Sequence, residues 1–317
     1  MVCKICNNSE NNIPFRIREM MVGSREYFSY FECSQCGCLQ IAVIPTNMDK
    51  YYPSNYYSFQ KVTYGNSLGR LLVTKRDQYV LFKTGTIGKL LSKKYPNEVL
   101  ELIAKSNINI ESRVLDVGCG SGGLLFLLKS LGMRNLVGVD PYAREEIKEQ
   151  NIRIVKATIH VLPDDRKFDL VIFNHSFEHI PDQLATLSKA CGMLSKSGVC
   201  LLRIPLKTDH IWNLYGIDWV QIDAPRHFFI HTMRSLKHLA DKVELLIKDV
   251  VFDSTEFQFW GSDQYKRDIP LTAENSYAVN PKKSIFTPRQ IAEFKKIAGD
   301  LNKTNRGDQA VFYLTKR

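Results

Sequence analysis

A glycine-rich turn at residues 118–123 is the part of the chain best suited to chemistry. Its glycines have the spacing Gly-x-Gly-x-x-Gly, and a short apolar run at residues 114–117 precedes them. Because glycine has no side chain, the backbone can approach a ligand closely there, and the N–H groups of a following helix face that ligand. The pattern predicts a nucleotide-binding turn, although an ordinary strand-to-helix connection has the same local appearance.

Two carboxylates beside this turn indicate which nucleotide binds. Asp116 lies just before the first glycine, where its charge would repel a pyrophosphate and attract an ammonium or sulfonium group. Asp140 ends a second short apolar run, the position from which a carboxylate accepts hydrogen bonds from both ribose hydroxyls. S-adenosylmethionine carries both cations and a ribose. A dinucleotide oxidoreductase is the alternative that the glycine spacing also allows, and Asp116 argues against it.

A third segment, residues 168–182, joins a predicted strand to the pair Glu178 and His179. Direct methyl transfer to a hydroxyl or an acidic carbon needs a base that removes the acceptor's proton. A histidine supported by a carboxylate titrates near neutral pH, so His179 and Glu178 are the first catalytic candidates and His175 is the next. A structural role for these side chains stays open. Residues 225–232 add two more histidines and an arginine suited to a phosphate or carboxylate.

In these three segments the chain resembles the class I S-adenosylmethionine-dependent methyltransferases, from about Arg113 to Pro205. The first motif of that family has the form of residues 115–122, and its fourth-strand motif, where the fold opens toward the transferred methyl group, has the form of residues 168–182. The resemblance implies S-adenosylmethionine as cofactor and a cofactor-binding set of Asp116, Gly118, Cys119, Gly120, Gly122, Asp140, Pro141, Ile159 and Asn174.

The chain departs from the family at one point. Many members carry an acid that reads the adenine amino group, whereas Lys156 and Ala157 stand at those places here. We therefore expect the backbone near Ile159 to contribute to adenine recognition.

Strand-like and helix-like segments alternate through the second half of the chain, which predicts an α/β fold. The resemblance implies a Rossmann-like, mostly parallel seven-stranded sheet with an antiparallel last strand, supplied by residues 309–314. We expect helices from residue 121, near Arg144, from residue 182, over residues 233–242 and from Pro288. Residues 253–307 form an expected insertion above the strand ends, where such folds build substrate contacts.

Five of the eight cysteines lie before residue 40. Two Cys-x-x-Cys pairs, Cys3 with Cys6 and Cys33 with Cys36, have the spacing with which four thiolates bind one tetrahedral zinc ion. Residues 13–32 alternate enough to form strands of a small zinc ribbon, so we interpret the metal as structural. Cys38 is either spare or an alternative fourth ligand. Free cysteines in a reducing cytosol are the alternative.

Composition places the chain among globular proteins, with 317 residues, 44% hydrophobic and 24% charged. No apolar run approaches the ~20 residues needed to cross a bilayer, so we expect a cytoplasmic protein without a membrane span. The net charge of +10 suits an anionic partner, but the basic residues form no continuous block. The sequence does not indicate an oligomeric state.

We expect three parts in the chain. Residues 1–45 form the zinc-ribbon module, and residues 107–317 form the methyltransferase domain. Between them, residues 46–106 begin with the tyrosine-rich stretch 51–59, which either covers a substrate or packs between the two parts, and continue as two or three amphipathic helices that we expect to cover the cofactor cleft.

The acceptor is the least constrained part of the prediction. A cysteine-rich module, a tyrosine-rich segment and a Glu-His pair resemble bacterial sugar methyltransferases that act on nucleotide-linked sugars or surface-polysaccharide precursors. An oxygen acceptor is at least as plausible as a carbon one. The alternatives are a ribosomal-RNA methyltransferase that uses its zinc ribbon for recognition, and a non-catalytic zinc-dependent binding protein.

Overall fold

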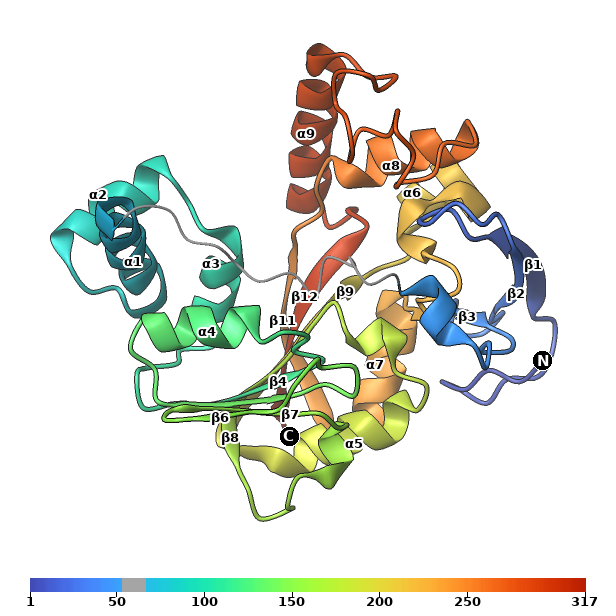
Figure 1. Cartoon of the computed structure of the whole chain (residues 1–317). Helices are drawn as coiled ribbons and strands as arrows, with labels where there is room; N and C mark the ends of the chain where they lie inside the picture. The colour runs from blue at the N-terminus through green and yellow to red at the C-terminus, as the bar shows by residue number, and fades with distance from the viewer. Residues whose placement is uncertain (53–66) are drawn as a thin grey trace.

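The computed structural model describes residues 1–52 and 67–317, and its centre is an eight-stranded sheet in the order β11-β12-β9-β8-β4-β5-β7-β6 (Figure 1). Five neighbouring strands, β9, β8, β4, β5 and β7, pair in parallel, and β12 runs antiparallel between β9 and β11. The predicted mostly parallel sheet with an antiparallel last strand is therefore confirmed. Its strands are β4 (Arg113–Val117), β5 (Asn135–Val139), β6 (Ile147–Glu149), β7 (Ile152–Val155), β8 (Phe168–Asn174), β9 (Leu194–Pro205), β11 (Leu245–Phe252) and β12 (Gln309–Lys316).

The eighth strand, β6, was not predicted, and the prediction of a helix near Arg144 is wrong. Instead, β6 pairs antiparallel with β7 at the sheet edge, with Ile147 opposite Ile154. Asn151 has a positive φ of 74°, which closes the turn between the two strands. This hairpin uses the residues that a helix there would need.

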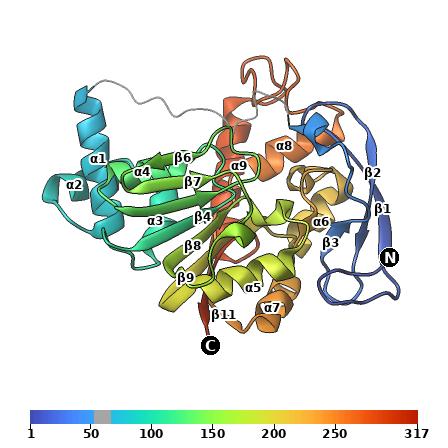
Figure 2. The ribbon, with the colours of Figure 1, turned by 60° about the horizontal axis from the view of Figure 1, so that its bottom comes forward.

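Helices cover both faces of the sheet. Apolar side chains of α1, α3 and α4 join one buried core, and those of α5 and α7 join another on the opposite face. Figures 1 and 2 show α1–α3 at one end of the molecule and the N-terminal strands at the other. The bounds are α1 (Ser67–Phe82), α2 (Thr86–Lys94), α3 (Glu98–Ala104), α4 (Gly123–Ser130), α5 (Gln183–Met193), α6 (Asp209–Tyr215) and α7 (Met233–Lys242).

Residues 253–307 contain two helices, α8 (Phe257–Lys266) and α9 (Pro288–Lys303). The start predicted at Pro288 is confirmed, because Thr287 caps the helix and Gln290 completes a capping box. No helix of the described residues is both long and apolar enough to cross a membrane.

A second, smaller sheet has the order β1-β2-β3-β10. Its first three strands come from the N-terminal segment, whereas β10 comes from the far half of the chain and pairs through Phe229 with Gln40. The pairing of β3 with β10 thus joins the N-terminal segment to the rest of the protein. The strands are β1 (Ile13–Arg18), β2 (Tyr27–Glu32), β3 (Leu39–Ile41) and β10 (Phe229–Ile230).

Candidate functional site

A cavity of about 680 Å³ lies at the carboxyl ends of β4, β5 and β8. The sheet order puts β4 between β5 and β8, so the strand order reverses there, which is the position at which open α/β sheets bind ligands. The N-terminal segment lines the cavity as well, through Ile44, Pro45, Thr46, Met48, Asp49 and Tyr52. Of the described side chains of residues 69–106, by contrast, none lines it, although we expected that region to cover the cleft.

The glycine turn after β4 forms one wall of this cavity. Gly118 has φ of +78° and its N–H donates to the Val139 carbonyl over 2.8 Å, which ties the turn to β5. A Cβ atom at Gly118 would lie 2.3 Å from the Cβ of Ser176, after β8. A side chain at residue 118 would therefore collide with the neighbouring strand end, so both the backbone angle and the space require glycine.

Asp140 fixes the second wall. Its Oδ2 accepts a hydrogen bond from the Gly120 N–H at 2.8 Å, and its Oδ1 accepts one from the Tyr142 N–H at 2.7 Å. The carboxylate therefore joins the glycine turn to the end of β5. Asp140 also lines the cavity, where a ligand hydroxyl can reach it.

Asp116 lies behind the turn, with 3% of its surface exposed. Burial, and secondly the charge of Asp140, raise the pKa of its carboxyl to about 7. A cation placed beside Asp116 would therefore stabilise the ionised carboxylate, which burial disfavours.

The structure brings only part of the predicted cofactor set to the cavity. Gly118, Gly120, Asp140, Pro141 and Ile159 line it. The other four lie behind or beside its wall: Asp116 at the end of β4, Cys119 with its sulfur against Gly138, Gly122 against Ile154, and Asn174, whose Oδ1 accepts a hydrogen bond from Arg203 at 3.3 Å.

The three catalytic candidates follow β8. His175, with φ of +52°, and His179 line the cavity, whereas Glu178 lies behind them with 1% of its surface exposed. His175 Nδ1 lies 3.6 Å from Glu178 Oε1. The sequence therefore predicted a group of side chains that the structure brings together.

Glu178 and His179 differ in which protonation state their surroundings favour. Burial alone would raise the pKa of the Glu178 carboxyl, but the contact with His175 and the charges of His179 and His227 lower it to about 2. Burial, and then the neighbouring His227, lower the pKa of His179 to about 4. At neutral pH the carboxylate is therefore ionised and the His179 imidazole carries a lone pair.

Two further side chains lie beside His179, one from the histidines of residues 225–232 and one from the tyrosine-rich stretch. The His227 ring packs edge-on against His179 with centroids 4.7 Å apart, and the Tyr52 hydroxyl lies 3.3 Å from His179 Nδ1. Tyr52 also stacks on Tyr142, with ring centroids 5.9 Å apart. The tyrosine-rich stretch was the signal for Tyr52, but its residues 53–59 lie outside the described residues.

A buried ion network connects the N-terminal segment to this region. Arg226 and Glu19 each have 0% of their side-chain surface exposed, and their charged groups lie 3.1 Å apart. Arg226 also pairs with Asp223 at 2.6 Å, while its backbone carbonyl lies 2.8 Å from His179 Nδ1. Glu19 and Asp223 thus together balance the charge of the arginine whose backbone carbonyl lies against His179.

His231 was also a candidate from the sequence. Its Nδ1 lies 2.9 Å from Ser235 Oγ and its Nε2 lies 2.9 Å from Gln183 Oε1. Both ring nitrogens therefore have partners inside the core, which indicates a structural role for His231.

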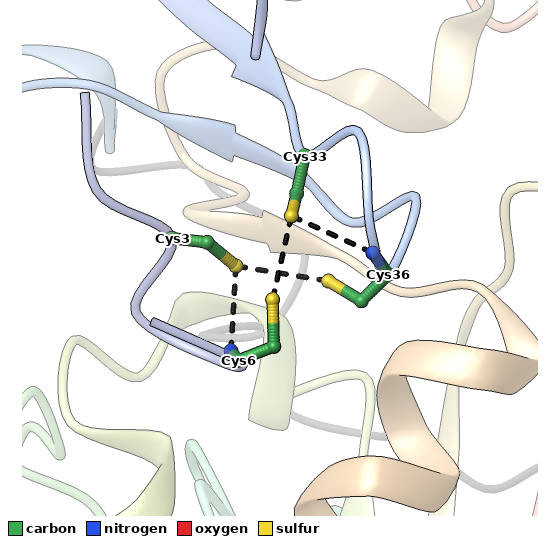
Figure 3. Close-up of side chains that lie close together, drawn as sticks. All are labelled: Cys3, Cys6, Cys33 and Cys36. Atoms are coloured by element: carbon green, nitrogen blue, oxygen red, sulfur yellow. Dashed lines mark hydrogen bonds between the residues drawn. The ribbon is translucent and has the colours of Figure 1, made fainter. Parts of the chain in front are cut away.

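The two predicted cysteine pairs meet in the N-terminal segment (Figure 3). The Sγ atoms of Cys3 and Cys36 lie 3.6 Å apart, and those of Cys6 and Cys33 lie 3.4 Å apart. Four sulfurs about 2.3 Å from one zinc ion would be separated by roughly 3.8 Å, so these spacings suit a tetrahedral ion. Cys38, with 0% of its surface exposed, directs its sulfur toward the Leu39 carbonyl at 3.7 Å and lies outside this group.

A family model described as a methyltransferase domain matches residues 89–247. The chain is similar to the trans-aconitate 2-methyltransferase of Enterobacter sp. (strain 638), with 29% identity over 34% of this chain and 45% of that protein. It is also similar to the tRNA U34 carboxymethyltransferase of Nautilia profundicola, with 27% identity over 47% of this chain and 52% of that protein. The chain thus spans about half the length of these curated relatives.

Among solved structures, the chain is similar to a cyclopropane synthase from Mycobacterium tuberculosis, with a TM-score of 0.43, 17% identity, and coverage of 69% of this chain and 85% of that chain. It is likewise similar to a SAM-dependent methyltransferase from Archaeoglobus fulgidus, with a TM-score of 0.40, 22% identity, and coverage of 72% of this chain and 98% of that chain.

Proposed function

The chain belongs to the family of methyltransferase domains, and from this premise we propose that it transfers a methyl group from S-adenosylmethionine to a sugar or nucleotide-linked sugar. Such a reaction serves the synthesis of surface polysaccharides or related products, in the cytoplasm. The observation that carries the proposal is the cavity, because it joins the glycine turn and Asp140 on one side to His175 and His179 on the other. Its volume lies in the range that holds small ligands.

The cofactor binds, in this proposal, along the ends of β4 and β5. Asp140 accepts hydrogen bonds from the ribose, Gly118 and Gly120 let the backbone approach the ligand, and Asp116 stabilises its positive charge. Ile159 lies on the wall where the adenine would pack. The remaining members of the set, Cys119, Gly122, Pro141 and Asn174, shape the turn and the strand ends.

The acceptor approaches from the side of His175, Glu178 and His179. Its hydroxyl oxygen forms a bond to the methyl carbon as the carbon–sulfur bond breaks, and the sulfur keeps the electron pair, so S-adenosylhomocysteine leaves. The hydroxyl proton passes to this histidine–carboxylate group. The stacked rings of Tyr52 and Tyr142 offer flat faces of the kind that sugars and bases bind.

Calorimetry with S-adenosylmethionine tests the cofactor assignment. Because the pKa of Asp116 is raised to about 7, the empty protein holds a proton there at lower pH and must release it to pair with a cation. Affinity is therefore expected to rise by up to about tenfold per pH unit below pH 7 and to level off above it. Asp116→Asn should remove this pH dependence. Absence of binding at every pH would contradict the enzyme assignment.

The acceptor class is tested by following labelled methyl transfer to nucleotide sugars, to polysaccharide precursors and to total RNA, in separate reactions. Transfer to the sugars supports the proposal. Transfer to RNA alone would replace it with the RNA methyltransferase alternative, for which the net charge of +10 is the favourable feature. Cofactor binding without transfer to any acceptor would favour the non-catalytic alternative.

We further propose that Cys3, Cys6, Cys33 and Cys36 hold a structural zinc ion, with residues 1–45 as a zinc-ribbon module. The sulfurs fit the ion, and the Cys6 and Cys36 N–H groups each lie 3.5 Å from a cysteine sulfur, which would stabilise thiolates. The module precedes a tyrosine-rich and helical linker, residues 46–106, whose described part contains α1, α2 and α3. The methyltransferase domain, residues 107–317, follows and carries the insertion 253–307.

Replacing Cys33 with serine is expected to lower the zinc content by about one ion per chain, because one thiolate ligand is lost. The N-terminal sheet should then unfold at a lower temperature. Metal analysis and thermal melting measure the two effects. Cys191→Ser is the matched control, since Cys191 lies on α5 outside the group. Equal zinc content in both variants would contradict the zinc site.

A further inference from the structure

A second group of metal-ligating side chains lies at the cavity, far along the sequence from the four cysteines. Glu178, His179 and His227 each offer one ligand atom, and these atoms lie within 4.8 Å of one another. The first two belong to the 3-10 helix η4 (Phe177–His179), and His227 belongs to the loop before β10. Two imidazoles and one carboxylate are a common ligand set for divalent transition metals.

Both histidines are held in the tautomer that metal binding requires. His227 Nδ1 lies 2.7 Å from the Gln221 carbonyl oxygen, and His179 Nδ1 lies 2.8 Å from the Arg226 carbonyl oxygen. A carbonyl oxygen only accepts, so each Nδ1 carries the hydrogen and each Nε2 keeps its lone pair. Such backbone hydrogen bonds orient metal-ligating histidines in proteins.

The Glu178 carboxylate lacks the partners that a buried charge needs. Within the described residues, neither of its oxygens has a hydrogen-bond partner. The nearest basic groups are His175 Nδ1 at 3.6 Å and His227 Nε2 at 3.9 Å from Oε1, both beyond hydrogen-bonding distance. Because burying an unpaired carboxylate is costly, a cation between these side chains would satisfy it.

The group also has an open side. His179 lines the cavity, whereas Glu178 and His227 lie behind it. Three protein ligands with one side open to a ligand cavity are the arrangement of catalytic metal sites, in contrast to the closed group of four cysteines.

We propose that Glu178, His179 and His227 bind one divalent transition-metal ion. Binding of the ion does not depend on the proposed function, whereas its role rests on it. The ion coordinates the acceptor's hydroxyl oxygen and lowers the pKa of that hydroxyl. The proton passes to His175, which is not a ligand, and the oxygen takes the methyl group.

Titration with Co²⁺ tests the site in the full chain, with zinc retained at the cysteines. Equilibrium dialysis should show one Co²⁺ bound per chain, and the visible spectrum should lack the intense bands of cobalt–thiolate bonds, which would report exchange into the cysteine site. Glu178→Gln keeps the shape of the side chain and His227→Ala removes one imidazole. Each should weaken Co²⁺ binding by at least about tenfold.

His210→Ala is the matched control, because His210 lies on α6 outside the group and contacts Arg306. It should bind Co²⁺ as the unaltered protein does. Thermal melting and S-adenosylhomocysteine calorimetry confirm that each variant folds. Absence of Co²⁺ from the unaltered protein, or equal affinity in Glu178→Gln, would overturn the proposal. Cofactor binding without Co²⁺ would overturn only this site, whereas Co²⁺ binding without the cofactor would overturn only the proposed function.

Discussion

Replacing Asp140 with alanine is expected to lower the affinity for S-adenosylhomocysteine by about 100-fold or more. A hydrogen bond to a charged group contributes roughly 1.5–3 kcal/mol, and about 1.4 kcal/mol changes an equilibrium tenfold, so loss of two ribose contacts accounts for this figure. The variant also loses the acceptor for the Gly120 and Tyr142 N–H groups, which releases the glycine turn. Calorimetry on the purified variant measures the change.

Two further variants separate these contributions. Asp140→Asn retains an oxygen that one backbone N–H can use but loses the charge, so its affinity should fall between those of the alanine variant and the unaltered protein. Asp300→Ala, on the surface of α9, should bind as the unaltered protein does. An Asp140→Ala protein that binds S-adenosylhomocysteine normally would contradict the placement of the ribose.

Replacing His179 with alanine is expected to lower kcat by about 10²–10⁴-fold while the affinity for S-adenosylhomocysteine stays within about twofold. We expect the two quantities to differ because His179 belongs to the histidine–carboxylate group after β8 and not to the glycine turn. Single-turnover methyl transfer and calorimetry measure the two quantities separately.

The comparison variant is His210→Ala, which removes a histidine outside the cavity and should leave both quantities unchanged. A parallel fall in turnover and cofactor affinity for His179→Ala would instead assign His179 to the cofactor pocket. Unchanged turnover would remove it from the catalytic group altogether.

Features encoded in short contiguous stretches could be predicted from the sequence. The apolar run, the glycines and Asp116 lie within ten residues, and the alternation of strand-like and helix-like segments predicted the α/β fold. The hairpin that replaces the helix near Arg144 could not be predicted in this way, because β6 has only three residues and its pairing with β7 depends on a single turn at Asn151.

Contacts between segments far apart in the chain could not be predicted from local sequence patterns. Tyr52 and His179 are 127 residues apart in the chain, and Glu19 and Arg226 are 207 apart. Neither hydrophobic periodicity nor residue spacing reports such pairs. Glu19 carries no local signal of its burial, and the residues of segment 44–49 that line the cavity form no recognisable motif of the kind seen in the glycine turn.

The buried Arg226 limits how the protein can be divided. A fragment that starts after residue 52 would keep Asp223 beside the guanidinium but lose Glu19, and it would leave the edge of β10 without β3. Leaving a buried charge without any partner costs about 3–5 kcal/mol, and loss of one of two partners costs part of that, which is still a notable share of the stability of a domain. We therefore expect residues 53–317 alone to be less stable than the full chain, with a less firmly held Arg226 carbonyl, the group that lies against His179 Nδ1.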